Sequence, residues 1–149
     1  MIVLDTNVIS EPLRGVGDPK VREWLNTQSP ETLYTTAINV AELLAGVACL
    51  PAGRRQRELS ERLRATLTRL FQGRVLFFDL SAAEAYSQIA AESKRSGKTV
   101  PHDDGLIAAI ARTAMSEKSR SGGRPLRPNA TRAAPASRTM SSKNALRSW

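Results

Sequence analysis

Short apolar segments of strand character alternate with amphipathic segments of helical character over residues 1–114, and this alternation constrains the fold most. The expected strands, at residues 2–4, 32–35 and 75–78, are separated by expected helices at residues 19–25, 38–47, 54–71 and 81–97, with a last helix after residue 102. Strands separated by helices favour an α/β fold with a parallel sheet. In such sheets, functional residues usually lie beyond the carboxyl ends of the strands.

Helix boundaries can also be read from the sequence. Ser81 and Glu84 match a capping box and predict the start of the fourth helix, and Gly97 predicts its end. The last helix is expected to begin around Asp103 or Asp104, and we expect Asp103 to be its N-cap.

The positive charge of the chain lies in its last part. Residues 1–114 carry 14 Lys and Arg against 13 Asp and Glu, so that +7 of the net charge of +8 comes from residues 115–149. From Met115 onward, Ser, Arg, Gly, Pro and Ala dominate without apolar periodicity, which predicts a basic, disordered tail over residues 115–149 after a domain of residues 1–114. A frameshift in a GC-rich gene is our hypothesis for this abrupt change.

The sequence predicts a cytoplasmic protein without a membrane segment. Cys49 is the only cysteine, so no intramolecular disulfide can form. The N-terminus lacks the pattern of a signal peptide, and no apolar run approaches the roughly 18 residues of a membrane span.

Three acids are candidates for a functional site. Asp5 follows the first expected strand, Glu42 lies within an apolar helix, and Asp104 opens the last helix. A buried acid is costly unless a cation or strong hydrogen bonds compensate it. Carboxylates that gather at one point repel each other, and Mg²⁺ relieves this repulsion because it binds oxygen ligands.

Each acid also has a purely structural interpretation. Asp5 could cap the turn that follows it, Glu42 could lie on the solvent edge of its helix, and Asp103 or Asp104 could only cap the last helix. We expect Asp104, rather than Asp103, to point into the site. His102 is interpreted as a loop residue or a neighbour of the site, and not as a general base.

Three segments in order, residues 4–10 (LDTNVIS), 36–43 (TAINVAEL) and 104–109 (DGLIAA), resemble the successive motifs of PIN-domain nucleases. The resemblance is to the VapC-like toxins, including the FitB-type branch, and it extends over residues 1 to about 114. It implies a PIN-like three-layer α/β sandwich with a central, mostly parallel sheet. It also implies that Asp5, Glu42 and Asp104 gather around Mg²⁺ or Mn²⁺, with Thr6 and Asn7 in the same pocket. Asp5 and Asp104 are the expected direct ligands, whereas Glu42 is expected to bind through water.

The resemblance further implies the function. The expected activity is Mg²⁺-dependent endoribonuclease chemistry, as the toxin of a toxin–antitoxin pair, leaving 5′-phosphate and 3′-hydroxyl ends. The expected partners are RNA as substrate, a small antitoxin and a second copy of the chain, with operator DNA bound only through the antitoxin.

The chain departs from the family after its last motif. No Asp follows Asp104, and Glu117 is the only later acid, so the fourth acid and the final strands of the family are not recognisable. This departure favours an alternative, a catalytically impaired PIN fold that acts with an antitoxin on operator DNA. A haloacid-dehalogenase-like phosphatase with Asp5 as nucleophile ranks last, because that pattern requires an Asp where this chain has Asn7.

Overall fold

A central parallel sheet of three strands organises the part of the chain that the structure describes. The computed structural model describes residues 1–13 and 17–122. Strands β1 (Ile2–Val3), β2 (Leu33–Thr36) and β3 (Val75–Leu76) are arranged in the order β1-β2-β3. Both pairs are parallel, with β2 in the middle.

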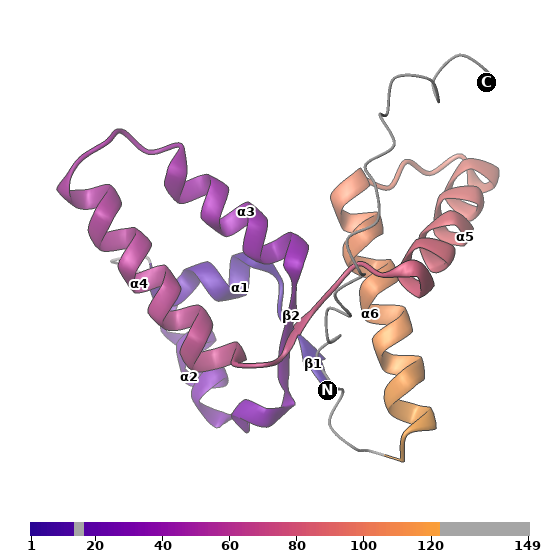
Figure 1. Cartoon of the computed structure of the whole chain (residues 1–149), viewed down its shortest axis with the longest axis horizontal. Helices are drawn as coiled ribbons and strands as arrows, with labels where there is room; N and C mark the ends of the chain where they lie inside the picture. The colour runs from indigo at the N-terminus through magenta and orange to yellow at the C-terminus, as the bar shows by residue number, and fades with distance from the viewer. Residues whose placement is uncertain (14–16, 123–149) are drawn as a thin grey trace, which may run out of the picture.

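Helices cover both faces of this sheet. They are α1 (Thr6–Ser10), α2 (Pro19–Thr27), α3 (Ala37–Ala48), α4 (Arg54–Phe71), α5 (Leu80–Ser96) and α6 (His102–Arg120), with 3₁₀ turns at Glu11–Leu13 and Pro30–Thr32. Helices α1 to α4 lie on one side of the sheet, and α5 and α6 lie on the other (Figure 1). The predicted α/β sandwich with a parallel sheet is therefore confirmed. The two helices with 18 or more residues, α4 and α6, are too polar to cross a membrane, and no other described helix is long enough.

The alternation of side chains along β2 divides the core into two parts. All four residues of β2 are buried. Leu33 belongs to a cluster with Ile9, Leu63 and Phe71 on the α1–α4 side. Tyr34 faces the other side, where the Lys118 ammonium group of α6 lies 5.9 Å from the centre of its ring. Burial on both faces fixes the position of β2, and therefore the position of the helix that follows it.

The start of α5 differs from the prediction. The N-cap is Asp79, whose Oδ1 accepts a hydrogen bond from the backbone N of Ala82 at 2.9 Å. Ser81 lies inside the helix and donates its hydroxyl to the same Asp79 oxygen at 2.7 Å. The predicted capping box of Ser81 and Glu84 was therefore wrong, because an acid two residues earlier reaches the free backbone N–H groups first.

Helix α6 differs from the prediction at both ends. It begins at His102, with Pro101 before it and no side-chain cap, so the prediction of Asp103 as N-cap was wrong. The helix ends at Arg120, so the predicted domain boundary at residue 114 falls inside it. This extension of α6 brings Lys118 beside the N-terminus, where partial burial and the neighbouring Lys118 lower the pKa of the Met1 amino group. The prediction for residues 123–149, and with it the frameshift hypothesis, lies outside the described residues.

The N-cap of α5 gives a test of this local structure. Replacement of Asp79 by Ala should lower the free energy of unfolding by about 1 kcal/mol, because the first turn of α5 loses its acceptor. Ser81→Ala is the matched control and should cost less, since Asp79 still caps the helix. Urea unfolding measures both values. A larger loss in Ser81→Ala than in Asp79→Ala would contradict the assignment of the cap.

Candidate functional site

One predicted acid, Asp5, and the cap of the helix that carries Glu42 lie where two parallel strands end. Asp5 comes directly after β1 and its adjoining residue Leu4, and it is the N-cap residue of α1. Its carboxylate makes no capping hydrogen bond to that helix, so the simple capping interpretation does not apply. Thr36 ends β2 and caps α3 by accepting a hydrogen bond from the backbone N of Asn39 at 3.1 Å. Since β1 and β2 are parallel neighbours, these ends meet at one edge of the sheet.

The buried side chain of Asn39 connects these two strand ends. Its amide nitrogen donates to Asp5 Oδ1 at 3.2 Å and to Thr6 Oγ1 at 3.0 Å. Its amide oxygen accepts a hydrogen bond from Thr36 Oγ1 at 2.5 Å. Asn39 is 0% exposed, and both polar atoms of its side chain make hydrogen bonds within this network. The side chain of Asn39 thus fixes the positions of Asp5 and Thr6 relative to α3.

Thr6 extends the network to Glu42. The Thr6 hydroxyl accepts a hydrogen bond from Asn39 and donates its own proton to Glu42 Oε2 at 2.5 Å. Glu42 lies three residues after Asn39, which places both side chains on the same face of α3. Asn7 adds a longer hydrogen bond, 3.4 Å, to the second oxygen of Asp5. The carboxylates of Asp5 and Glu42 therefore belong to one connected set of polar groups.

The two acids of this network lie at the surface. Asp5 and Glu42 are exposed, which agrees with the interpretation of Glu42 on the solvent edge of its helix, so neither acid carries a cost of burial. Among the described residues, the buried polar side chains are those of Asn39, Thr35 and Thr36. Within the described parts of the chain, no buried side-chain polar atom lacks a hydrogen-bond partner. The exposed acids are thus held by buried polar side chains whose hydrogen-bonding groups all have partners.

Sequence reasoning missed Asn39 as a site residue. The available signal was its position: a single amide within an apolar helix, three residues after a capping Thr and three residues before Glu42. An Asn in such a helix needs hydrogen-bond partners. The sequence does not show which residues these partners are, because Asp5 and Thr6 lie more than 30 positions away from Asn39.

Asp104 is not part of this network. It lies with Asp103 in the first turn of α6, and both side chains are exposed. Over residues 1–13 and 17–122, no group of three or more His, Cys, Asp or Glu residues is close enough to hold a metal ion. His102 makes a hydrogen bond of its own, with Nδ1 at 2.8 Å from the Tyr86 hydroxyl oxygen. The structure therefore joins Asp5 and Glu42 and leaves Asp103 and Asp104 outside.

The donor atoms of the network suit a hard divalent cation. Asp5, Glu42 and Thr6 offer only oxygen atoms on the exposed side. Mg²⁺ prefers such ligands and commonly uses one or two carboxylates together with waters. A buried Asn39 that orients a carboxylate is the kind of outer support that metal ligands require. The residues present therefore fit a Mg²⁺ or Mn²⁺ site in their chemistry.

Comparison with known proteins shows the family. The PIN domain matches residues 2–118, and the chain belongs to this family. It is 48% identical over 111 residues to the VapC ribonuclease Y4jK of Sinorhizobium fredii, which covers 74% of this chain and 79% of that protein. It is 47% identical over 112 residues to the toxin FitB of Neisseria gonorrhoeae, which covers 75% of this chain and 81% of FitB.

A solved structure shows the same fold. FitAB bound to an IR36 DNA fragment superposes with a TM-score of 0.71 at 45% identity, covering 76% of this chain and 80% of that chain. The predicted resemblance to PIN-domain toxins of the VapC and FitB type is confirmed. The haloacid-dehalogenase alternative is excluded by the family match.

The role of Asn39 as a support can be tested by substitution. Asn39→Ala should lower the free energy of unfolding by about 1–3 kcal/mol, because the buried Thr36 hydroxyl loses its acceptor and Asp5 loses a donor. Asn7→Ala is the control, since Asn7 is exposed and makes one long hydrogen bond to Asp5. It should change stability by less than about 0.5 kcal/mol. Equal losses in urea unfolding would show that Asn39 is not the centre of the network.

Proposed function

We propose that this protein is a divalent-metal-dependent endoribonuclease and that it acts as the toxin of a toxin–antitoxin pair. The observation that carries the proposal is the network of Asp5, Asn39, Thr6 and Glu42 at the carboxyl ends of β1 and β2. It lies in a PIN-domain chain whose relatives include a protein named VapC ribonuclease. Its two carboxylates are exposed and so accessible to a polymer as large as RNA.

The protein's own residues prepare the site. Asn39 donates to one oxygen of Asp5 and leaves the carboxylate oriented at the edge of the sheet. Thr6 donates to Glu42, which restricts the rotation of that longer side chain. Both hydrogen bonds lower the entropy lost when the acids bind a cation or order a water molecule.

The residues that would hold the metal are Asp5 and Asp104, with Glu42 binding through water. When bound, Mg²⁺ or Mn²⁺ polarises a phosphate oxygen and neutralises the charge that develops during hydrolysis. Asp104 would contribute its carboxylate from the first turn of α6, on a different element from Asp5 and Glu42. Glu42 would orient water near the phosphate and accept its proton.

The proposed partners are a small antitoxin, a second copy of the chain and operator DNA bound through the antitoxin. Support comes from the similarity to the toxin FitB and to FitAB solved with a DNA fragment. We place the protein in the cytoplasm, where its RNA substrate would be found and where the exposed thiol of Cys49 would stay reduced.

A second candidate is a catalytically impaired binding protein that acts with an antitoxin on operator DNA. The observation that favours it is the separation of Asp104 from the other two acids in the described structure. Cleavage assays distinguish the two candidates, because only the nuclease depends on the acids.

The nuclease proposal predicts metal-dependent cleavage of RNA. Purified protein should cleave single-stranded RNA with Mg²⁺ or Mn²⁺ and lose this activity in EDTA. Asp5→Asn should abolish cleavage while the protein remains folded, because the new amide oxygen can still accept the hydrogen bond of Asn39. Glu31→Gln makes the same charge change at an exposed position away from the site and should cleave normally. Undiminished cleavage by folded Asp5→Asn would disprove the mechanism.

The neighbouring acids of α6 give a second activity test. Asp104→Asn should remove cleavage, whereas Asp103→Asn should retain it. Both acids lie in the first turn of α6, so each substitution should cost a similar 0.3–1 kcal/mol or so of stability through the helix dipole. Cleavage rates and thermal unfolding measured on both variants separate the two effects. Equal losses of activity would show that Asp104 has no special role.

A further inference from the structure

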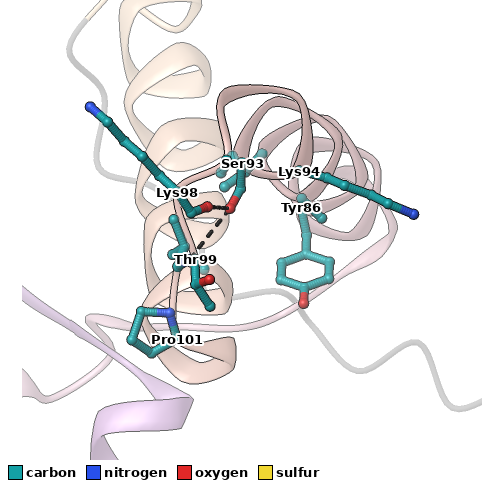
Figure 2. A pocket seen from close by; sticks show the side chains of 11 residues that line it. Tyr86, Ser93, Lys94, Lys98, Thr99 and Pro101 are labelled. Atoms are coloured by element: carbon teal, nitrogen blue, oxygen red, sulfur yellow. Dashed lines mark hydrogen bonds between the residues drawn. The ribbon is translucent and has the colours of Figure 1, made fainter.

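A pocket of about 440 Å³ lies between α5 and the beginning of α6, apart from the Asp5 network. It is lined by α5 from Tyr86 to Lys94, the connection at residues 97–101 and the first turn of α6. Figure 2 shows its polar lining: Tyr86, Ser93, Lys94, Lys98 and Thr99, with Pro101. The volume lies within the range of pockets that hold small organic groups.

The aromatic wall of this pocket is fixed in place. The Tyr86 hydroxyl is hydrogen-bonded to His102, and the rings of Tyr86 and His102 lie edge to face with centroids 5.5 Å apart. Phe78 makes a second edge-to-face contact with Tyr86 at 6.4 Å. A Cβ at Gly105 would approach Tyr86 Cε2 at 3.0 Å, so the missing side chain lets the ring lie against α6. Tyr86 is therefore held as a rigid ring at the pocket.

The loop that closes the pocket is also well supported. Gly97 has φ of 66°, a left-handed conformation that ends α5 and turns the chain back. The Ser93 hydroxyl donates to the backbone oxygen of Lys98 and accepts from the backbone N of Val100 at 3.3 Å. The lysine side chains at positions 94 and 98 are exposed and extend outward from the rim (Figure 2).

The lining is positive and contains no acid. Across the residues that the structure describes, neither Lys94 nor Lys98 forms an ion pair. The pocket also continues directly into the turn of α6 that carries Asp104, because Pro101 and Gly105 both line it. A ligand in this pocket would thus meet the aromatic ring of Tyr86, and a strand that leaves the pocket would pass the lysines at the rim.

We propose that this pocket binds one nucleotide of single-stranded RNA next to the phosphate that is cleaved. Its base would stack on Tyr86, because stacking on an aromatic ring holds unpaired bases with little sequence preference. The ammonium groups of Lys94 and Lys98 would contact the flanking phosphates. The assignment rests on the proposed nuclease function, and it adds the residues that position the RNA strand.

RNA binding in EDTA tests this pocket without cleavage. The probe is a fluorescently labelled single-stranded RNA of 12 nucleotides and mixed sequence, titrated with the full chain and followed by anisotropy. Tyr86→Leu should raise the Kd by at least about fivefold, because the stacking ring is lost. Tyr86→Phe keeps the ring and should bind within about twofold of the wild type. The basic residues after position 122 are present in every variant, so their contribution is common to all.

The salt dependence identifies the phosphate contacts. Removal of both lysines, K94A with K98A, should reduce the slope of log K against log salt by about 1.4, since each contact to a single strand contributes about 0.7. The control K20A removes an exposed lysine from α2 and should leave both the Kd and the slope unchanged. A slope and a Kd that stay at the wild-type values in the double variant and in Tyr86→Leu would overturn the pocket assignment.

The outcomes also separate this inference from the nuclease proposal. Tyr86- and lysine-dependent RNA binding without Mg²⁺-dependent cleavage would support the pocket and contradict the nuclease. Cleavage that is equal in the wild type and the pocket variants, with equal RNA affinity, would overturn the pocket and leave the nuclease standing. Wild-type protein without measurable RNA affinity in EDTA would overturn the pocket, and the cleavage assay with Mg²⁺ would then decide the nuclease separately.

Discussion

The buried amide of Asn39 is the interaction on which the site depends. It binds Asp5 and Thr6, which follow β1, and Thr36, which ends β2. These partners come from two strands that are far apart in sequence, and only the parallel pairing of β1 and β2 brings them to one edge. A buried amide with all partners present rigidifies its surroundings, whereas an unpaired one is costly. The network therefore makes the geometry of the acids sensitive to the integrity of the sheet.

The central position of β2 explains how exposed acids can be held firmly. Its residues are buried on both faces, by the α1–α4 core and by α6. Helix α3 starts directly after β2, so the position of β2 also fixes the first turns of α3. In these turns Asn39 is buried and Glu42 is exposed. Asp104 is positioned differently, through α6 and the connection from α5. The acids are thus positioned by two different parts of the fold. Asp5 and Glu42 depend on β1, β2 and α3, whereas Asp104 depends on α5 and α6, which also line the pocket at Tyr86.

The sequence predicted the features that depend on local patterns. Apolar periodicity located the three strands and the long helix α4, and the three motifs indicated the family. The partners of Asn39 were not predictable, because they depend on contacts across more than 30 residues. The cap of α5 was missed because two acceptors, Asp79 and Ser81, lie within reach of the same turn and local sequence does not rank them. The end of α6 was missed because its last residues are mostly polar, and the contact of Lys118 with the ring of Tyr34 joins positions far apart in sequence.

Calorimetry of Mn²⁺ binding to the apoprotein shows whether the Asn39 network prepares a metal site. We expect one saturable site per chain that Asp5→Asn abolishes and that Asn39→Ala weakens by about 10–100-fold, because a group that orients a ligand is lost. A binding curve that is unchanged in folded Asn39→Ala and Asp5→Asn, or the absence of saturable binding to the wild-type protein, would contradict this role of the network.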